Sequence, residues 1–435
     1  MELRYSEAAV SIPAERAATG PRPLWWITLG IVALAFFVTD HDVRVSVVEA
    51  FTMTADEMLD TAGGGNARRQ LAFLSLAAVG IYDLARRSEQ TFRLSGGLAA
   101  CVLFFVAWCT ASIVWSVEPG MTLRRVVVML CCVLAAAGVA RQLTPRELCQ
   151  MALVLSTGFL LMGIAAEIAL GAFRPWSGDY RFSGSLHPNT QGMNLAALCL
   201  SAFCLSRSSE RHRSLYLGLL AFGFVFLVLT KSRTSTAGVV ASLALIWSLD
   251  VSIRANVLAW LGFGWSLGMA ALVVMIAGID IEEELSRVML MGREEEASSL
   301  TGRLPIWTEL TYYVLRRPFF GHGFDSFFNA WQIDEITRTL QWPIREAHNA
   351  YIETLLTVGA VGLAALLAAV VLAMRRSGLA FLRNRDPAYA YFFGMFAFGL
   401  MNAGTESGMV TPLMVPFLNG CAICHLAFVK GDEPS

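Results

Sequence analysis

The stretch "REAHNAYIETLLTVGAVGL", residues 345–363, joins a charged segment to a long apolar one. From Ala350 onward the apolar run is long enough to enter a bilayer, because a spanning helix needs about 20 predominantly apolar residues. Arg345, Glu346 and His348 stand directly before it. These three side chains are therefore expected at a membrane surface, and any chemistry they perform is expected to take place there.

The composition of the whole chain predicts a polytopic membrane protein. Its 435 residues are 56% hydrophobic and only 15% charged, with a mean hydropathy of +0.56, which is too apolar for a soluble domain. Most cysteines lie inside apolar runs and indicate no disulfide framework. The apolar runs predict an all-α integral membrane protein with about twelve transmembrane helices, near residues 24–39, 70–85, 97–116, 126–140, 149–171, 191–206, 214–230, 235–250, 256–279, 349–374, 388–404 and 410–429.

The polar segments divide the chain into parts. We expect 280–348 to be a long loop between the ninth and tenth helices, since such a segment could not cross hydrocarbon with its backbone unpaired. Within it, "TGRLPIWTELTYYVLRR" has apolar residues at helical spacing, with Thr301 as the expected N-cap. The expected organisation is a cytoplasmic segment at 1–23, helices one to nine at 24–279, the loop at 280–348, helices ten to twelve at 349–429, and a cytoplasmic tail at 430–435.

Arginines in the short loops indicate the orientation of the chain. Cytoplasmic loops of membrane proteins carry an excess of Lys and Arg. If the amino terminus is cytoplasmic, this excess falls on one side, at Arg86, Arg87, Arg93, Arg141, Arg146, Arg207, Arg211, Arg213, Arg375, Arg376, Arg383 and Arg385. The long segment at 280–348 is then predicted to lie on the outer face.

A second set of cations lies at the predicted outer ends of the helices, against this rule. The set comprises Arg124, Arg125, Arg174, Arg181, Lys231 and Arg233, together with Arg303 and Arg345 in the outer segment. Taken singly, such residues can be span-end arginines that extend their charge into water. Taken as a set, they indicate a large anionic ligand at the outer surface, because guanidinium groups bind phosphate in a bidentate manner.

His348 stands at the outer end of the tenth predicted helix. We expect Tyr351 and Ile352, three and four residues later, to share its helical face. A neutral imidazole at this place can accept a proton from a hydroxyl group. The alternative is an interfacial histidine with an ordinary hydrogen bond, and the residues alone leave both readings open.

An ordered set of motifs resembles the O-antigen ligase and polymerase superfamily of bacterial surface-polysaccharide enzymes. The motifs are "YRFSGSLHPN" at 180–189, "TKSRTS" at 230–235, "TGRLPIW" at 301–307, "GHGFDSFF" at 321–328, "AHNAYIETLLTVGAVG" at 347–362 and, closer to the exopolysaccharide-polymerase branch, "WSVEPGMTLRR" at 115–125. The resemblance covers most of the chain from about residue 115 onward. It implies a GT-C-like membrane fold, a glycan donor carried on undecaprenyl pyrophosphate, and a glycan acceptor that is either a lipid-linked repeat or lipid A core.

The same resemblance implies roles for individual residues at the periplasmic face of the bacterial inner membrane. Arg181, Arg233 and Arg303 would hold the pyrophosphate, and His348 would activate the acceptor hydroxyl. Transfer without a metal, no other cofactor and no nucleic-acid partner are expected. Polymerisation of lipid-linked repeats is the preferred activity and ligation to lipid A core the alternative, while Glu353 and Glu406 receive no role. Supporting roles fall on Asn349, Lys231, Tyr351, His187, Trp307 and Arg345.

Three other patterns point to different functions. Asp40 and Asp42 in "TDHDVR" are hard oxygen ligands that, with His41 between them, would suit Mg²⁺ or Mn²⁺. "CAICH" at 421–425 has the spacing for haem attachment but lies inside an apolar run, so we interpret it as coincidence. About twelve helices also suit a transporter. The unusual charges gather at helix ends, and no internal duplication is visible, which favours an interfacial enzyme.

Overall fold

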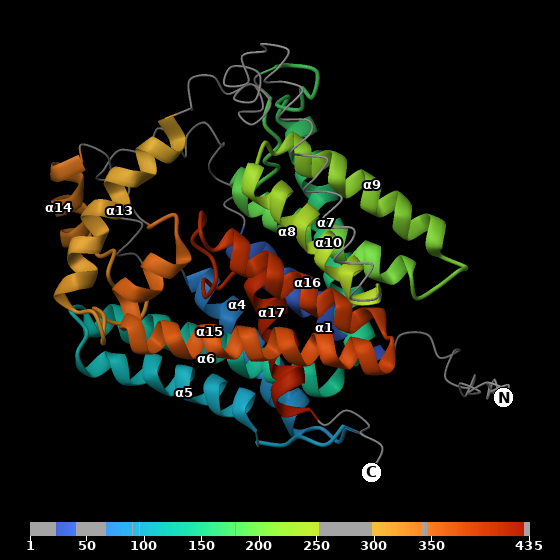
Figure 1. Cartoon of the computed structure of the whole chain (residues 1–435), viewed down its shortest axis with the longest axis horizontal. Coiled ribbons are helices and arrows are strands. Elements are labelled where there is room, and N and C mark those ends of the chain that lie inside the picture. Colours follow the sequence, from blue (N-terminus) through green and yellow to red (C-terminus); the bar gives the residue numbers. More distant parts are fainter. Residues whose placement is uncertain are drawn as a thin grey trace, which may run out of the picture.

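The computed structural model describes residues 23–40, 67–88, 90–94, 96–178, 180–251, 298–340, 344 and 346–429. These residues form an all-helical protein, with one isolated β-bridge between Phe92 and Val429 (Figure 1). The helices are α1 (Pro23–Asp40), α4 (Ala67–Ala85), α5 (Gly97–Ala111) with the 3₁₀ turn η1 (Ser112–Val114), α6 (Pro119–Gln142), α7 (Pro145–Ala169), α8 (Pro188–Ser206), α9 (Arg213–Leu229), α10 (Arg233–Asp250), α13 (Ser298–Arg316), α14 (Ala330–Leu340), α15 (Ala350–Asn384), α16 (Pro387–Asn402) and α17 (Met414–Phe428).

The apolar runs predict these helices well. Eleven of the twelve predicted segments coincide with a helix, from α1 to α10 and from α15 to α17, and the twelfth, 256–279, lies outside the described residues. Among the described residues, 4 helices are long and apolar enough to cross a membrane, and shorter apolar helices accompany them. The 4 helices are α5 with η1, α6, α7 and α15.

Small residues let the helices approach closely. A Cβ atom on Gly80 of α4 would lie 2.4 Å from the Leu134 carbonyl oxygen of α6, and one on Gly138 of α6 would lie 2.4 Å from the Gly80 oxygen. Such close backbone contact is the usual way in which membrane helices associate, because lipid provides no hydrophobic driving force between them. Helix α8 lies at the centre of its neighbours, and every residue from Gln191 to Ala202 is buried.

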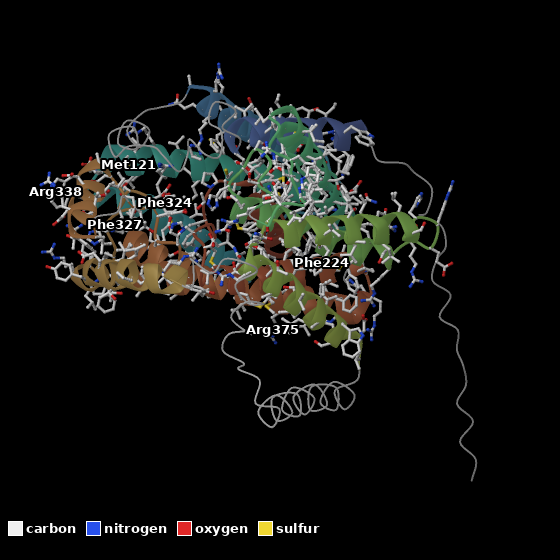
Figure 2. The ribbon with its side chains drawn as sticks, turned by 90° about the horizontal axis from the view of Figure 1, so that it is seen from above. Met121, Phe224, Phe324, Phe327, Arg338 and Arg375 are labelled. Carbon is white, nitrogen blue, oxygen red and sulfur yellow. The ribbon has the colours of Figure 1, made fainter. Side chains whose placement is uncertain are left out.

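The functional end of the bundle is the one at which α6, α8, α10 and α15 begin. Because consecutive helices alternate in direction, the turn η1 and the connections α7–α8, α9–α10 and α16–α17 meet there. Helices α13 and α14 cover this end (Figure 1). Figure 2 shows Met121, Phe324, Phe327 and Arg338 gathered at one end of the long axis, away from Phe224 and Arg375. Seven of the cations predicted to face outward lie on these segments or on α13, namely Arg124, Arg125, Arg174, Arg181, Lys231, Arg233 and Arg303, whereas Arg345 lies outside the described residues.

Helix α15 is broken near its start, although the sequence predicts one continuous span at 349–374. Gly359 has φ 69° and ψ −174°, a conformation that is essentially restricted to glycine. The freed backbone groups find partners in the 318–323 loop: His322 N donates to Leu356 O at 2.8 Å, Gly323 N to Thr357 O at 2.9 Å, and Ala360 N to Pro318 O at 2.8 Å. Non-helical backbone at membrane depth is tolerated where protein satisfies it in this way.

The motif "GHGFDSFF" supplies this loop. A Cβ on Gly321, which has φ 66°, would lie 2.5 Å from the Thr357 carbonyl, and a Cβ on Gly323 would lie 2.2 Å from Ser116 Oγ. The motif "WSVEPGMTLRR" packs on the same loop, where Val117 N donates to His322 O at 2.9 Å and Arg125 pairs with Asp325 at 3.4 Å. Both motifs therefore have a structural role, which is to hold the broken part of α15.

The helical unit expected within 280–348 is present as α13 and α14. Ile306, Leu310 and Tyr313 of α13 pack in one cluster with Ile336 of α14. The sequence prediction of Thr301 as the N-cap was wrong, because α13 begins at Ser298 and Thr301 lies within the helix. The unit carries Arg303 on α13 toward the functional end of the bundle.

Candidate functional site

The site begins with the loop "YRFSG", which a buried carboxylate holds in place. Glu167, near the end of α7, accepts hydrogen bonds from the backbone N–H groups of Ser183 at 2.9 Å and Gly184 at 2.8 Å, and from the hydroxyl of Tyr180. Glu167 is only 4% exposed. A side chain that accepts several hydrogen bonds is a strong local anchor, so the backbone on either side of Arg181 is fixed.

Arg181 joins this loop to two neighbouring helix starts. Its Nε donates to the Thr230 carbonyl at 2.8 Å, at the end of α9, and its NH2 atom donates to Asn189 Oδ1 at 2.7 Å, in the first turn of α8. Arg233 begins α10 three residues after Thr230, with a half-buried side chain. The predicted pyrophosphate arginines Arg181 and Arg233 therefore belong to adjacent segments at the same end of the bundle.

Asn189 and Glu406 extend the cluster to the third predicted arginine. Asn189 Nδ2 donates to Glu406 Oε1 at 2.7 Å, and Arg303 NH2 lies 3.2 Å from the same oxygen. Arg303 NH1 also donates to the Thr405 carbonyl at 2.5 Å. A continuous hydrogen-bonded chain, Arg181–Asn189–Glu406–Arg303, thus brings together residues that are more than one hundred positions apart in the sequence.

His348 lies beside this hydrogen-bonded series of side chains, just before the start of helix α15. Its φ is 47°, in the left-handed region that non-glycine residues rarely adopt. The expected sharing of a helical face with Tyr351 and Ile352 was wrong, because α15 begins at Ala350 and Asn349 is its N-cap. Strained backbone of this kind persists only where the surrounding structure imposes it, and it is frequent at functional sites.

The residues that flank His348 are firmly attached. Trp307 of α13 donates from Nε1 to the Ala347 carbonyl at 3.0 Å. Asn349 Oδ1 accepts from the N–H groups of Tyr351 and Ile352, while its Nδ2 donates to Gly404 O at 3.0 Å. The imidazole therefore stands on a backbone that is held from α13 on one side and from the α16–α17 connection on the other.

The electrostatic surroundings keep this imidazole neutral. Burial lowers the pKa of His348 to about 4, and the charge of Arg303 acts in the same direction. Glu346 Oε1 lies 3.1 Å from His348 Nδ1. Burial raises the pKa of Glu346, the nearby Glu353 and Glu406 raise it further, and Arg303 opposes them. A neutral imidazole has the free nitrogen that accepting a proton requires, and ionisation of the neighbouring Glu346 carboxyl group makes it a stronger base.

The other predicted supporting residues have mixed outcomes. His187 is the N-cap of α8 and accepts from Asn189 N at 3.3 Å, so it supports the cluster through the backbone. Lys231, at φ 52°, donates to Gly178 O on the α7–α8 connection. Tyr351 donates to the Leu400 carbonyl at 2.6 Å. Arg345 lies outside the described residues.

Sequence reasoning missed Asn189, Glu167 and the role of Glu406 in this site. Asn189 is the last residue of "YRFSGSLHPN", so its motif was noticed but not its side chain. Glu406 and Glu167 each stand alone as a carboxylate in or beside an apolar run, and this isolation was the available signal. The sequence predicted only that Glu346 lies at the membrane surface, whereas the structure also places it against His348.

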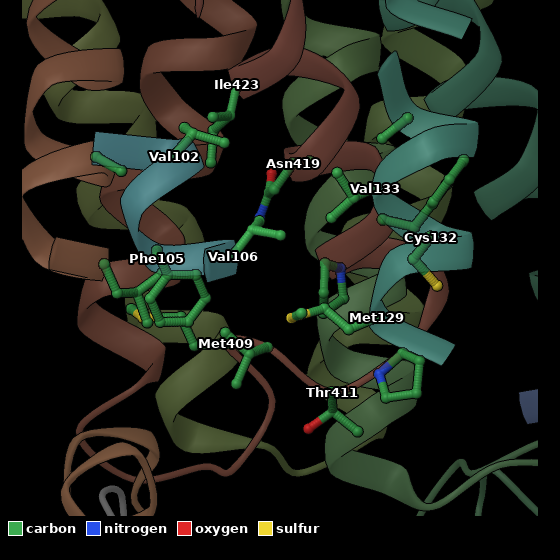
Figure 3. A pocket seen from close by; sticks show the side chains of 18 of the residues that line it. Val102, Phe105, Val106, Met129, Cys132, Val133, Met409, Thr411, Asn419 and Ile423 are labelled. Atoms are coloured by element: carbon green, nitrogen blue, oxygen red, sulfur yellow. The ribbon is translucent and has the colours of Figure 1, made fainter. Parts of the chain in front are cut away.

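An apolar cavity of about 200 Å³ lies between α5, α6, α15, α16 and α17. Figure 3 shows Val102, Phe105 and Val106 of α5 on one side of it and Met129 and Cys132 of α6 on the other. Arg125 and Asp325 are among the few charged residues that line it. A smaller cavity shares Phe324, Asp325, Met409, Val410 and Thr411 with it and extends to Ala350 and Glu353. The cavity therefore leads toward the residues next to His348.

The competing patterns do not form sites in the described residues. Asp40 accepts a hydrogen bond from Met414 N at 3.1 Å at the start of α17, and Asp42 lies outside the described part. No group of three or more potential ligands for a metal ion occurs among the described His, Cys, Asp and Glu residues. His425 of "CAICH" is buried within the bundle, with Nδ1 3.1 Å from Ala140 O.

The fold and the site together define an all-helical membrane protein with a charged, partly buried site at one end of its helices. A comparison with family models is more specific: residues 218–367 match the O-antigen ligase family. Within this region the resemblance to the O-antigen ligase and polymerase superfamily that the motifs indicated is confirmed. The matched region includes Arg233, Arg303 and His348, while Arg181 and Glu406 lie outside it. No curated protein sequence matches the chain.

Proposed function

We propose that this protein transfers a glycan from undecaprenyl pyrophosphate to a sugar hydroxyl at the periplasmic face of the bacterial inner membrane. The observation that carries the proposal is the convergence of Arg181 and Arg303 in one hydrogen-bonded chain next to the strained His348. The O-antigen ligase match supports glycan transfer as the reaction class. The apolar helices support a lipid-linked donor.

The arginines stabilise the leaving group. When the bond between the anomeric carbon and the pyrophosphate breaks, negative charge develops on the phosphate oxygens, and preplaced guanidinium groups stabilise that charge. Arg303 is paired with Glu406, and Arg181 with Asn189 and the Thr230 carbonyl. The pyrophosphate takes the place of the Glu406 carboxylate as the anion at Arg303. Burial raises the pKa of Glu406, while Arg303 and the hydrogen bond from Asn189 oppose this shift.

His348 acts on the acceptor. Its neutral imidazole takes the proton of the attacking hydroxyl as the new glycosidic bond forms. Attack from the face opposite the leaving group inverts the anomeric centre. The position of His348 immediately before α15 suits this step, since the pyrophosphate lies at the membrane surface and the acceptor sugar approaches from water.

The cavity between α5, α6 and α17 takes part of the polyprenyl tail. Its lining is almost entirely apolar, as an isoprenoid chain requires. The connection between α16 and α17 lines this cavity with Met409 and Val410 and carries Glu406 to the arginine cluster. One connection therefore touches both the polar and the apolar part of the donor.

The preferred activity is polymerisation of lipid-linked repeats, which accords with the "WSVEPGMTLRR" motif. Ligation of finished glycan to lipid A core uses the same chemistry with a different acceptor. Deleting the gene and analysing the surface glycan separates the two. Single repeats attached to the core indicate a lost polymerase, whereas bare core with accumulated lipid-linked polymer indicates a lost ligase. Unchanged polymer length and attachment would contradict both.

Purified His348→Ala protein tests the chemical role. We expect transfer to fall by about 10²–10⁴-fold, the usual contribution of a positioned base, with donor binding retained. His212→Ala is the matched control, since His212 is an exposed histidine before α9. Normal transfer in His348→Ala, or loss of donor binding with intact chemistry once donor is bound, would refute the assignment.

A further inference from the structure

We propose that Glu346 is a positioning residue of this active site. Its carboxylate accepts a hydrogen bond from Nδ1 of His348 and thereby directs Nε2 of the imidazole toward the acceptor hydroxyl. This inference rests on the proposed function, because it assigns a partner to the histidine that activates the acceptor.

The exposure of the imidazole shows which nitrogen faces the substrate. His348 Nδ1 is buried and has no hydrogen-bond partner of good geometry among the described residues. Yet 33% of the His348 side chain is exposed. Because Nδ1 is inaccessible, a hydroxyl group can reach the imidazole only through the remaining part of the ring, which includes Nε2. A buried nitrogen that faces a carboxylate and a ring nitrogen left for the substrate form the arrangement of a histidine base with its orienting acid.

The distance between the Glu346 carboxylate and His348 Nδ1 suits a hydrogen bond that forms fully during the reaction. Glu346 Oε1 lies 3.1 Å from Nδ1, although the pair does not meet the geometry of a hydrogen bond. Catalytic hydrogen bonds are often poorly aligned without substrate and improve when substrate binds. Although 47% of the Glu346 side chain is exposed, desolvation where its carboxyl group lies beside Glu353, Glu406 and Arg303 raises its pKa.

The backbone between the two residues is arranged for this contact. Ala347 is fully buried, and its carbonyl accepts from Trp307 Nε1, which fixes the point between Glu346 and His348. The positive φ of His348 turns the chain sharply before Asn349 caps α15. Such a conformation is strained in a non-glycine residue. An ordinary helical start at His348 would carry its side chain onto the face of α15, so the strain serves to place the ring elsewhere.

Charged groups on three elements face the pair. They are Arg303 on α13, Glu353 on α15, and Glu406 on the α16–α17 connection. Burial and the two carboxylates raise the pKa of Glu346, so this group ionises only above the usual carboxylate range. The low pKa of His348 keeps the imidazole neutral. As the pH rises, the active state, a neutral imidazole beside an ionised carboxylate, therefore forms when Glu346 loses its proton.

The acceptor oxygen forms a bond to the anomeric carbon while the bond from that carbon to the pyrophosphate oxygen breaks, and the bonding electrons leave with undecaprenyl pyrophosphate. The hydroxyl proton moves to Nε2 of His348. The resulting imidazolium keeps its Nδ1 proton, hydrogen-bonded to the Glu346 carboxylate, which neutralises the new positive charge.

The test is the pH dependence of single-turnover transfer in Glu346→Gln and Glu346→Asp. We expect Glu346→Gln to lower the rate by about 10- to 100-fold, part of the contribution of a positioned base, with donor binding unchanged. The wild-type rate should rise with pH as Glu346 loses its proton and be lost as pH falls through this pKa. That rise should disappear in Glu346→Gln and persist, displaced in pH, in Glu346→Asp. Glu118→Gln, which alters an exposed carboxylate before α6, should leave both rate and profile unchanged.

The outcomes separate this inference from the proposed function. If Glu346→Gln keeps the wild-type rate and profile while His348→Ala is inactive, the inference is wrong and the proposed function stands. A slower Glu346→Gln protein with an unchanged pH profile also overturns the inference, because Glu346 would then act only on structure. If Glu346→Gln does not fold, the profile of Glu346→Asp decides, since an unshifted rise refutes the pairing. Full activity in His348→Ala would instead refute the proposed function itself.

Discussion

Replacing Gly359 by alanine tests the break in α15 that sets the start of this helix beside the arginine cluster. A Cβ atom at this position would lie 2.2 Å from the Phe319 carbonyl oxygen and 2.3 Å from its carbon. These are backbone atoms, so no side-chain rotation can relieve the overlap. The φ of 69° adds strain for any residue that has a Cβ. Either α15 or the 318–323 loop must therefore move.

The expected cost follows from these contacts. The backbone conformation alone costs about 1–3 kcal/mol for a non-glycine residue. Movement of the loop also breaks the hydrogen bonds that Ala360 N and Val361 N donate to Pro318 O and Phe319 O. Each such bond contributes about 1 kcal/mol. The sum of about 3–5 kcal/mol is a large part of the stability of a typical domain.

The assay is equilibrium unfolding of the detergent-purified protein, followed by circular dichroism. Gly158→Ala is the matched control, because Gly158 lies inside α7 and a Cβ there meets nothing within 4 Å. Alanine favours a helix interior by about 0.5–1 kcal/mol over glycine, so the control should be as stable as wild type or slightly more stable. If Gly359→Ala unfolds at the same denaturant concentration as wild type, the argument for an obligatory break in α15 is wrong.

Three further predictions concern the site. Arg303→Lys should weaken donor binding by about 10- to 100-fold, because the point charge of lysine cannot reproduce the two parallel hydrogen bonds of a guanidinium group. Equilibrium binding of a lipid pyrophosphate measures this loss. An unchanged affinity would count against the phosphate-binding role of Arg303. Glu167→Ala should weaken donor binding through Arg181, because it removes the acceptor of the Ser183 and Gly184 N–H groups. Tyr180→Phe should have a smaller effect, because it leaves those two hydrogen bonds in place. Equal effects of the two substitutions in the same binding assay would contradict this order. Transfer should persist in EDTA. If EDTA abolished turnover and Mg²⁺ or Mn²⁺ restored it, transfer would depend on a metal ion, and Asp40 and Asp42 would be the candidate ligands.

The sequence predicted most of the helices because the signal is local. Hydrocarbon excludes unpaired backbone, so each spanning segment must be both apolar and helical, and both properties are visible in a single run of residues. The same rule explains the error at α15. The apolar run continues through Gly359, and nothing within 349–374 reveals that a loop from 318–323 satisfies the backbone there.

The candidate site was predicted in part. The arginines were found because charge at a span end is conspicuous, and His348 was found through its motif. Their partners were not found, because Asn189, Glu406 and Glu346 become meaningful only through side-chain distances. Whether Asn189 donates a hydrogen bond to Glu406 depends on how α8 and α16 pack. The sequence separation of the two residues carries no information about that packing.

By itself, then, the sequence determined that this is an all-helical membrane protein, that its unusual charges gather at one set of helix ends, and that it carries O-antigen ligase motifs. Tertiary structure alone decided that Arg181 and Arg303 share one cluster, that α15 begins after His348 and breaks at Gly359, and that Glu346 faces the imidazole. The physical reason is that the first set of properties depends on residues close together in the sequence, and the second on residues far apart in it. Transfer of a segment from water to lipid depends on its own residues, whereas the direction of a buried charge depends on neighbours that the fold brings from distant parts of the chain.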